Sequence, residues 1–248
     1  MDSPEIIIIS LKRATERRKS IEKQFFELKL PFKFLDAVDG KQGHRLFARY
    51  DANKARRIGE IPLTSGHLGC YASHFLAWQH CINMGEPVIV LEDDAMVFPE
   101  PFLKFVKNSS NLPQEIECVR LFKNKSRNKK NWLIFKQGGL SIAKFLRGHK
   151  SATGYYLTPS AARKFLKYGE HWVEPVDIEM DQFWANGVEC YGVLDPCLTH
   201  NPDFESAIDS GIDTSQARRG LMRLRWRWHL LKGKVNRELH NYRFKARI

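Results

Sequence analysis

Three features are missing from this sequence, and each absence excludes a class of protein. The five cysteines are odd in number and include no Cys-x-x-Cys pair, which argues against a disulfide framework or a structural zinc site. No apolar run approaches the roughly 20 residues that span a bilayer, and the run at residues 6–9 is too short for a signal peptide. We therefore expect a globular protein of the reducing cytoplasm, in which 248 residues form a large domain with an appendage.

Acidic residues are scarce in two segments, so the net charge of +12 is unevenly placed. Residues 123–150 contain nine Lys and Arg and no acid, and residues 217–248 contain eleven Lys and Arg and one acid, Glu238. The rest of the chain has 20 basic and 27 acidic residues. Basic stretches with aromatic residues are typical of nucleic-acid-binding proteins, but such a protein needs no acidic remainder. We expect a mildly acidic globule with two basic patches and no nucleic-acid partner.

A short apolar strand at residues 88–91 ends in three consecutive carboxylates, Glu92, Asp93 and Asp94. In open α/β sheets, ligands collect outside the carboxyl ends of strands, so these acids mark a candidate site. If the chain stays extended, Glu92 and Asp94 point to one side of the strand and Asp93 to the other. Carboxylate oxygens suit Mg²⁺ or Mn²⁺, which proteins commonly hold together with substrate phosphates. The alternative is a solvated acidic turn or a helix cap.

Hydrophobic periodicity and capping residues predict the other elements. We expect strands at residues 5–11, 31–36, 118–122 and within 188–202, helices at 15–29, 64–84 and 101–106, a strand, turn and helix over 154–170, and a helix beginning within 174–184. No element is assigned to the basic segment 123–150. Lys12, Arg13, Arg17 and Arg18 follow the first strand, where basic side chains and free amides can hold a nucleotide's phosphates. Ordinary surface charge is the alternative for each of them.

Several separated segments match the pattern of one family. They are Ser10, Leu11, Arg13 and Arg17 after the first strand, DAVDG at 36–40, LTSGHLGCYASHFLAW at 63–78, VIVLEDDA at 88–95, GYYLTPSAA at 154–162, and PVD at 175–177. With these segments the chain resembles glycosyltransferase family 25, which includes lipooligosaccharide galactosyltransferases and collagen galactosyltransferase domains. The resemblance covers roughly residues 5–210. It departs at Ser10, which stands for the usual Asn, and at His67, which stands for a common Glu.

The resemblance implies an α/β fold of the GT-A-like, nucleotide-sugar-binding type, with a mainly parallel central sheet flanked by helices. We assign this domain to residues 1–216 and a basic helical tail to residues 217–248. The implied activity is the transfer of a hexose, galactose or alternatively glucose, from a UDP-sugar to a saccharide of the lipooligosaccharide core, with inversion at the anomeric carbon. A protein-directed enzyme that acts on hydroxylysine is the runner-up.

The resemblance also suggests roles for individual residues. The donor-binding set is Ser10, Leu11, Arg13, Arg17, Asp36, Asp39, Gly69, Ser73, His74, Glu92 and Asp93. A Mn²⁺ or Mg²⁺ ion would be held by Asp94, Glu92 and His200, and would stabilise the charge that develops on the departing diphosphate. Inversion needs a base to take the proton of the acceptor hydroxyl. Asp177 is the preferred base and Asp181, four residues later, is the second candidate; otherwise one caps a helix and the other binds a sugar hydroxyl.

The C-terminal segment is predicted to be a basic amphipathic helix. Its apolar positions step by three or four and are Leu221, Leu224, Leu231, Val235 and Leu239, with Trp228 and Tyr242 in the same series. Lys and Arg occupy the positions between them, a pattern that suits the headgroup layer of an anionic membrane. We expect a cytoplasmic protein, peripheral on the inner face of the bacterial inner membrane. Alternatively, the stripe packs on the globule or on a second subunit, which would form a homo-oligomer.

Overall fold

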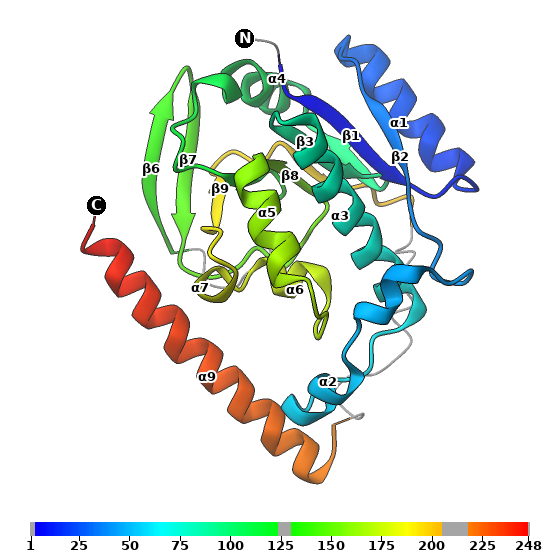
Figure 1. Cartoon of the computed structure of the whole chain (residues 1–248). Helices are drawn as coiled ribbons and strands as arrows, with labels where there is room; N and C mark the ends of the chain where they lie inside the picture. Colours follow the sequence, from blue (N-terminus) through cyan, green and yellow to red (C-terminus); the bar gives the residue numbers. More distant parts are fainter. Residues whose placement is uncertain (1–2, 124–129, 205–217, 248) are drawn as a thin grey trace.

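The structure is a computed structural model that describes residues 3–123, 130–204 and 218–247. Its centre is a sheet of eight strands in the order β2-β1-β3-β8-β5-β9-β7-β6 (Figure 1). The strands of this sheet are β1 (Glu5–Ser10), β2 (Lys33–Asp36), β3 (Val88–Glu92), β5 (Cys118–Arg120), β6 (Asn131–Gln137), β7 (Leu140–Phe145), β8 (Gly154–Leu157) and β9 (Tyr191–Val193). A second, two-stranded sheet pairs β4 (Ala95–Val97) with β10 (Leu198–His200).

Helices cover both faces of the large sheet. They are α1 (Thr15–Leu28), α2 (Ala52–Ile58), α3 (Ser65–Met84), α4 (Pro99–Asn108), α5 (Pro159–Tyr168), α6 (Val176–Met180), α7 (Phe183–Asn186) and α9 (Gly220–Lys245), with 3₁₀ turns at Arg45–Arg49 and Ser109–Asn111. Buried residues of α1 and α4 belong to one hydrophobic cluster, and those of α3 and α5 belong to another. The two clusters lie on opposite faces of the sheet, because they take alternate side chains of the same strands; Figure 1 shows how these helices lie about the sheet.

The strands β1 and β3 are apolar on both faces, and each contributes side chains to both hydrophobic clusters. Ile6 and Ile8 belong to the cluster with α1 and α4, whereas Ile7 and Ile9 belong to the cluster with α3 and α5. Side chains alternate along a strand, so one unbroken apolar run supplies both cores. The run at residues 88–91 divides in the same way. This pattern is typical of strands that are buried between two layers of helices.

Parallel pairing brings the polar ends of three strands to one edge of the sheet. β1 pairs in parallel with β2 and with β3, and the register places Ser10 opposite Asp36 and Ile9 opposite Glu92. The acidic residues after β3 therefore lie next to the basic loop that follows β1. The small sheet completes this edge, because β10 pairs antiparallel with β4 and its register sets His200 opposite Ala95, directly after Asp94.

The predicted fold class is confirmed, with some differences inside the sheet. The α/β arrangement, its flanking helices and its C-terminal helix agree with the expectation and are consistent with a GT-A-like fold. Pairing is mixed, since β8 is antiparallel to both β3 and β5, and β7 is antiparallel to β6 and β9. The hairpin β6–β7 lies in the basic segment to which no element was assigned. The predicted domain boundary at 216–217 lies outside the described residues.

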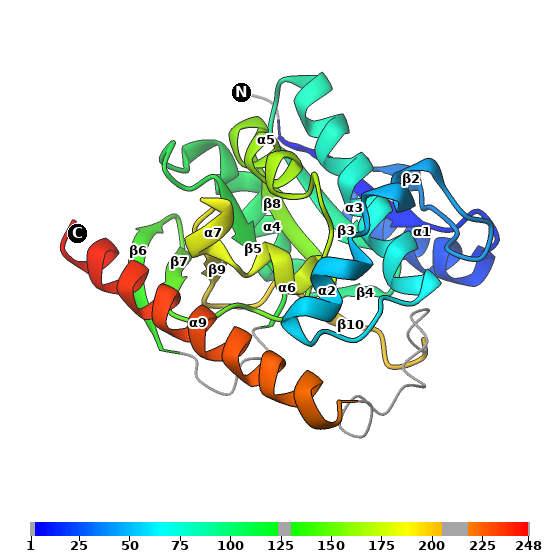
Figure 2. The ribbon, with the colours of Figure 1, turned by 60° about the horizontal axis from the view of Figure 1, so that its bottom comes forward.

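Helix α9 lies along the globule from α2 to the hairpin β6–β7 (Figure 2). Several polar contacts fasten it: Arg218 is ion-paired with Glu60, His229 Nε2 lies 3.3 Å from Glu174 Oε2, and His240 Nε2 lies 2.5 Å from Glu189 Oε1. The side of α9 that faces the globule is half-buried or buried and carries Met222, Trp226, His229, Gly233, Arg237, His240, Asn241 and Phe244. This inner face is mostly polar or aromatic.

The apolar stripe predicted for this helix lies on its outer side. Its seven residues, from Leu221 to Tyr242, are 49–77% exposed. The alternative that this stripe packs on the globule is therefore wrong, because the helix uses its other face for that contact. Within the described part of the chain, no helix is long and apolar enough to cross a membrane.

The packing of α3 against the loop after β2 generates a stability prediction. A Cβ at Gly69 would lie 2.6 Å from Val38 O and 2.8 Å from Gly40 N, both backbone atoms that cannot move independently. We expect Gly69→Ala to lower the free energy of unfolding by about 1–3 kcal/mol, as overpacking does. Urea denaturation of the variant and the wild type measures this difference in the free energy of unfolding.

Gly233→Ala is the matched control, since its Cβ would lie 3.6 Å from Trp184 Cζ2, an ordinary contact. Alanine is favoured over glycine inside a helix, so this variant should be as stable as the wild type or more so. Equal stability of Gly69→Ala and wild type would contradict the close packing.

Candidate active site

A cavity of about 740 Å³ opens at the carboxyl ends of β1 and β3, between α1 and the beginning of α3. Most of the residues that the sequence suggested for donor or metal binding line it: Ser10, Leu11, Arg13, Arg17, Asp39, Ser73, His74, Glu92, Asp93 and Asp94. Pockets of this size typically hold small-molecule ligands and place a few polar groups among apolar walls. The structure therefore brings most of these residues together at one cavity.

Asp93 fixes the basic loop after β1. Ser10 Oγ donates a hydrogen bond to Asp93 Oδ2 at 2.7 Å, and Arg17 Nη1 lies 3.0 Å from Asp93 Oδ1. Burial raises the pKa of Asp93, although these two donors act in the opposite direction. Arg18 Nε also contacts Ser10 Oγ at 3.3 Å. Ser10, where the family commonly has Asn, thus links the ends of β1 and β3.

Arg13 and Asp39 form a second bridge across the cavity mouth. Arg13 is ion-paired with Asp39, and Asp39 Oδ1 also accepts the backbone N–H of Lys41 at 3.0 Å. The backbone N–H of Val38 donates to Ser73 Oγ at 2.9 Å, which ties the same loop to α3. These contacts hold the DAVDG segment as one wall of the cavity.

Two residues of the predicted donor-binding set do not line the cavity. Asp36 lies at the end of β2, half exposed, where Arg18 and Lys12 approach it to 2.7 and 3.3 Å. The hydrogen bond from Arg18 is the main reason that the pKa of Asp36 is lowered. Gly69 lies behind the wall, where it permits the close approach of α3 to the loop after β2. In this structure, both residues support the cavity from outside it.

The three consecutive carboxylates have different partners, and the expected alternation of Glu92 and Asp94 depended on a chain that stays extended. β3 ends at Glu92, and residues 93–94 form a turn, so the alternation of an extended strand stops there. Asp93 bonds to Ser10 and Arg17, as described above. Glu92 faces α3, and Asp94 faces β10.

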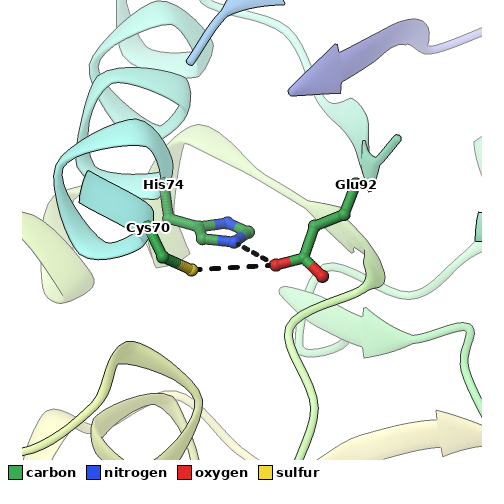
Figure 3. Close-up of side chains that lie close together, drawn as sticks. All are labelled: Cys70, His74 and Glu92. Atoms are coloured by element: carbon green, nitrogen blue, oxygen red, sulfur yellow. Dashed lines mark hydrogen bonds and ion pairs between the residues drawn. The ribbon is translucent and has the colours of Figure 1, made fainter. Parts of the chain in front are cut away.

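Glu92 meets two side chains of α3, as Figure 3 shows. His74 Nε2 lies 3.0 Å from Glu92 Oε1, and Cys70 Sγ lies 3.8 Å from the same oxygen. Burial acts to raise the pKa of Glu92, but the hydrogen bond and charge of His74 outweigh it and the pKa is lowered. His74 Nδ1 is held by the Tyr155 hydroxyl at 2.9 Å, which fixes the ring.

Cys70 was missed in the sequence as a site residue. Its position four residues before His74 puts both on one face of a helix, which was the available signal. Cys70, His74 and Glu92 could together hold a metal ion, since their ligand atoms lie within 4.8 Å of one another. Burial and the charge of Glu92 raise the pKa of the Cys70 thiol well above its usual value, so the thiol stays protonated without a metal.

Asp94 and His200 lie together, as the resemblance suggested. His200 Nδ1 is 3.3 Å from Asp94 Oδ2, and the backbone N–H of Asn201 donates to the Asp94 carbonyl at 2.8 Å. The other carboxylate oxygen, Asp94 Oδ1, is buried and has no hydrogen-bond partner among the described residues. Glu92 lies close enough for the charge of His200 to lower its pKa. A buried carboxylate oxygen without a partner is costly and would be satisfied by a cation.

The two candidate bases have different surroundings. Asp177, in the first turn of α6, interacts electrostatically with Glu92, Cys70 and His67, although it is not itself a lining residue of the cavity. Burial raises its pKa, and its carboxylate forms no ion pair within the described part of the chain. Asp181 does not line the cavity. It is buried, 3.2 Å from Arg120 Nη2, and accepts the Lys150 N–H at 2.7 Å.

His67 begins α3 together with Thr64. Thr64 Oγ1 accepts the backbone N–H of His67, and the His67 ring accepts the backbone N–H of Thr64, which completes a capping box. Glu or Gln commonly occupies this third helical position of a capping box, and here the His67 ring accepts the same backbone hydrogen bond. The cap keeps the first turn of α3, including Ser65 and Gly66, at the cavity wall.

Comparison with known proteins gives this geometry a context. A family model described as glycosyltransferase family 25 (LPS biosynthesis protein) matches residues 3–180. The lipooligosaccharide biosynthesis protein lex-1 of Haemophilus influenzae is 25% identical in an alignment of 295 positions, which includes gaps and covers 99% of this chain and 94% of that protein. Lipooligosaccharide biosynthesis protein lic2B of the same species is 27% identical over 167 residues, 63% of this chain and 60% of that protein.

A eukaryotic relative matches a shorter part. Procollagen galactosyltransferase 1 of Danio rerio is 30% identical over 131 residues, which are 49% of this chain and 20% of that protein. The chain thus spans less than two thirds of lic2B and about a fifth of the procollagen enzyme. Because the family model matches well over half of its residues, the chain belongs to glycosyltransferase family 25.

Proposed function

We propose that the protein transfers a hexose from a UDP-sugar to a saccharide of the lipooligosaccharide or lipopolysaccharide core, with inversion at the anomeric carbon. The observation that carries this proposal is the buried Oδ1 of Asp94, which has no hydrogen-bond partner among the described residues. Asp94 lines a cavity that also presents Arg13, Arg17 and the first turn of α3. The names of lex-1 and lic2B support the acceptor class. The name of the procollagen enzyme supports galactose over glucose.

The cavity suits a nucleoside diphosphate sugar. Guanidinium groups form paired, charge-assisted hydrogen bonds to phosphates, and the amides at the beginning of a helix favour anions. Arg13 and Arg17 already pair with Asp39 and Asp93, so a diphosphate would share these cations with the carboxylates. His74 would stay on Glu92, where Tyr155 orients it.

A divalent cation fits the acidic corner of the cavity. Asp94 and His200 would hold Mn²⁺ or Mg²⁺, with Glu92 close by, because Asp94 Oδ1 needs a partner and oxygen and imidazole ligands suit these ions. When bound, the cation stabilises the negative charge of the departing diphosphate. The set Cys70, His74 and Glu92 is the weaker candidate, since a metal-bound cysteine must lose the proton that burial helps it to keep.

Asp177 is the base in this proposal. Its carboxylate takes the proton of the acceptor hydroxyl while the new glycosidic bond forms, and its raised pKa strengthens it as a proton acceptor. Asp181 remains the second candidate, but its ion pair with Arg120 and its bond to the Lys150 N–H give it a structural task.

A protein-directed activity on hydroxylysine is the second candidate function, favoured by the 30% identity to procollagen galactosyltransferase 1. Transfer to a hydroxylysine-containing peptide, without transfer to a core oligosaccharide, would select it.

Helix α9 supports a location at an anionic membrane surface. Its outer stripe is 49–77% exposed, and the basic residues beside it point to an acidic headgroup layer. Each base near such a surface adds about 1 kcal/mol of attraction. A lipid-linked acceptor would be concentrated there. A second subunit on the stripe is the alternative occupant.

The metal assignment predicts the effect of Asp94→Asn. We expect this variant to lose at least about 100-fold of its Mn²⁺-dependent UDP-galactose hydrolysis, a typical loss when one stabilising group is removed. Electron paramagnetic resonance should also show weaker Mn²⁺ binding. Asp195→Asn, which changes an exposed carboxylate between β9 and β10, is the control and should behave as the wild type. Full turnover and full Mn²⁺ binding by Asp94→Asn would refute the assignment.

The base assignment predicts a kinetic and a pH effect. Asp177→Asn should lower kcat by about 10²–10⁴-fold with little change in KM for the donor. Because burial raises the pKa of Asp177, the wild-type rate should fall as pH drops through that raised value, above the usual 3.8. Asp181→Asn should instead lower the melting temperature, since it weakens the pair with buried Arg120. If Asp181→Asn alone abolished turnover while the protein stayed folded, Asp181 would be the base.

The membrane proposal predicts a loss of vesicle binding when the stripe is made polar. Leu224→Gln with Leu231→Gln should weaken cosedimentation with phosphatidylglycerol-containing vesicles by at least about tenfold, since two exposed apolar side chains no longer insert. Glutamine keeps the helix propensity of leucine. The control pair, Leu103→Gln with Leu133→Gln, changes two exposed leucines elsewhere. Equal binding by both pairs would show that α9 is not the contact.

A further inference from the structure

A second, larger cavity lies between α9 and the main domain. It has a volume of about 1000 Å³, and α6, α7 and the loop at residues 147–150 form its other walls. Figure 2 shows α9 running beside α6 and α7 there. We call it the α9 groove. It shares no lining residue with the cavity at the ends of β1 and β3.

The α9 groove is strongly basic. Six Lys or Arg side chains line it: Arg147, Lys150, Lys232, Lys234, Arg237 and Arg243. Only two acids line it, and each already has partners. Asp181 is bonded to Arg120 and to the Lys150 N–H, and Glu174 contacts Gln182 Nε2 at 2.5 Å and His229 Nε2 at 3.3 Å.

The basic side chains of the groove outnumber its acidic side chains, so most of them have no acidic partner there. Within the described residues, Arg147, Lys150, Lys234 and Arg243 form no ion pair, and Arg237 pairs with Glu238 at 3.3 Å. The Nε of Arg237 is buried and has no hydrogen-bond partner among the described residues. A buried donor of this kind is costly unless a ligand accepts from it. The groove therefore has an excess of positive charge, and one of its lining arginines has an unsatisfied hydrogen-bond donor.

Helix α6 separates the α9 groove from the candidate active site. Asp177, early in α6, interacts electrostatically with Glu92 and Cys70 on the active-site side, whereas Ile178 and Asp181 line the groove. The helix is only five residues long. Asp177 lines neither cavity, but its neighbour Ile178 lines the groove, so a molecule whose hydroxyl lies at Asp177 would have the groove beside it.

We propose that the α9 groove binds phosphate groups carried by the acceptor saccharide. This inference rests on the proposed function, because it takes Asp177 as the position of the acceptor hydroxyl. Lys and Arg form charge-assisted hydrogen bonds with phosphate, and Trp184 supplies an apolar surface in the same groove for the sugar rings. The protein would then select acceptors by phosphate content at a distance from the bond that forms.

The test compares one acceptor in two forms: deacylated lipooligosaccharide core oligosaccharide with its phosphates, and the same preparation after their removal. We expect Lys234→Gln with Arg243→Gln to raise the KM for the phosphorylated form by about tenfold, to the value of the dephosphorylated form, because two charge-assisted contacts are lost. The kcat and the hydrolysis of UDP-galactose without acceptor should not change.

The control pair is Arg223→Gln with Arg225→Gln, which removes the same charge from exposed positions of α9 outside the groove. It should leave both KM values unchanged. Calorimetric binding of the two oligosaccharides repeats the comparison without turnover. An equal KM and affinity for the two forms in the wild type, or an equal effect of both variant pairs, would overturn the proposal. Absence of UDP-galactose hydrolysis in the wild type would count against the proposed function instead.

Two further arms distinguish the source of the phosphate. Inorganic phosphate should compete with the phosphorylated oligosaccharide only weakly, since it lacks the sugar that contacts Trp184. Phosphatidylglycerol vesicles should bind the groove pair and the control pair equally. If the groove pair alone lost vesicle binding, the groove would hold lipid headgroups, and the acceptor proposal would be wrong.

Discussion

The parallel pairing of β1 with β3 determines where the polar residues of this chain meet. Their register sets Ile9 opposite Glu92, so both strands end at one edge of the sheet. The hydrogen bond from Ser10 to Asp93 then closes the gap between the two strand ends. Both strands are held by two hydrophobic layers that share their alternating side chains. A slip of one residue would exchange these layers and separate the two ends, so core packing and cavity geometry depend on the same register.

The carboxylates of the site are all partly or fully buried, but their pKa values are shifted in different directions because their partners differ. Glu92, Asp93 and Asp177 all lose solvation, which raises a carboxyl pKa. His74 overcomes this effect at Glu92, whose pKa is lowered, whereas the pKa values of Asp93 and Asp177 stay raised. One charged group thus anchors α3, one anchors the basic loop, and Asp177 is suited to accept a proton. Asp94 differs again, because its Oδ1 has no hydrogen-bond partner in the part of the chain that the structure describes.

Helix α9 is oriented with its less apolar side inward. Histidines, Asn241 and aromatic residues face the globule, and leucines face out. A helix that served only to cover the domain would bury its apolar side, since that burial provides most of the stabilisation. The observed orientation leaves an apolar surface on one side and a basic groove on the other. The two surfaces suit a lipid-linked, anionic acceptor, as we propose.

The sequence alone determined the α/β class and the approximate strand and helix positions, because apolar alternation and helix caps are local signals, and the family resemblance pointed to many of the residues that line the cavity. Tertiary structure decided the rest. The turn after Glu92 gave the three acids different partners, Asp181 was paired with Arg120, and Cys70 joined His74 at Glu92. The sequence also did not predict that β8 pairs antiparallel with β3 and β5, or that residues 131–145 form the hairpin β6–β7. Strand order depends on contacts between distant segments. The stripe on α9 was readable from its spacing, but which side of the helix meets the globule follows only from ion pairs such as that of His229 with Glu174.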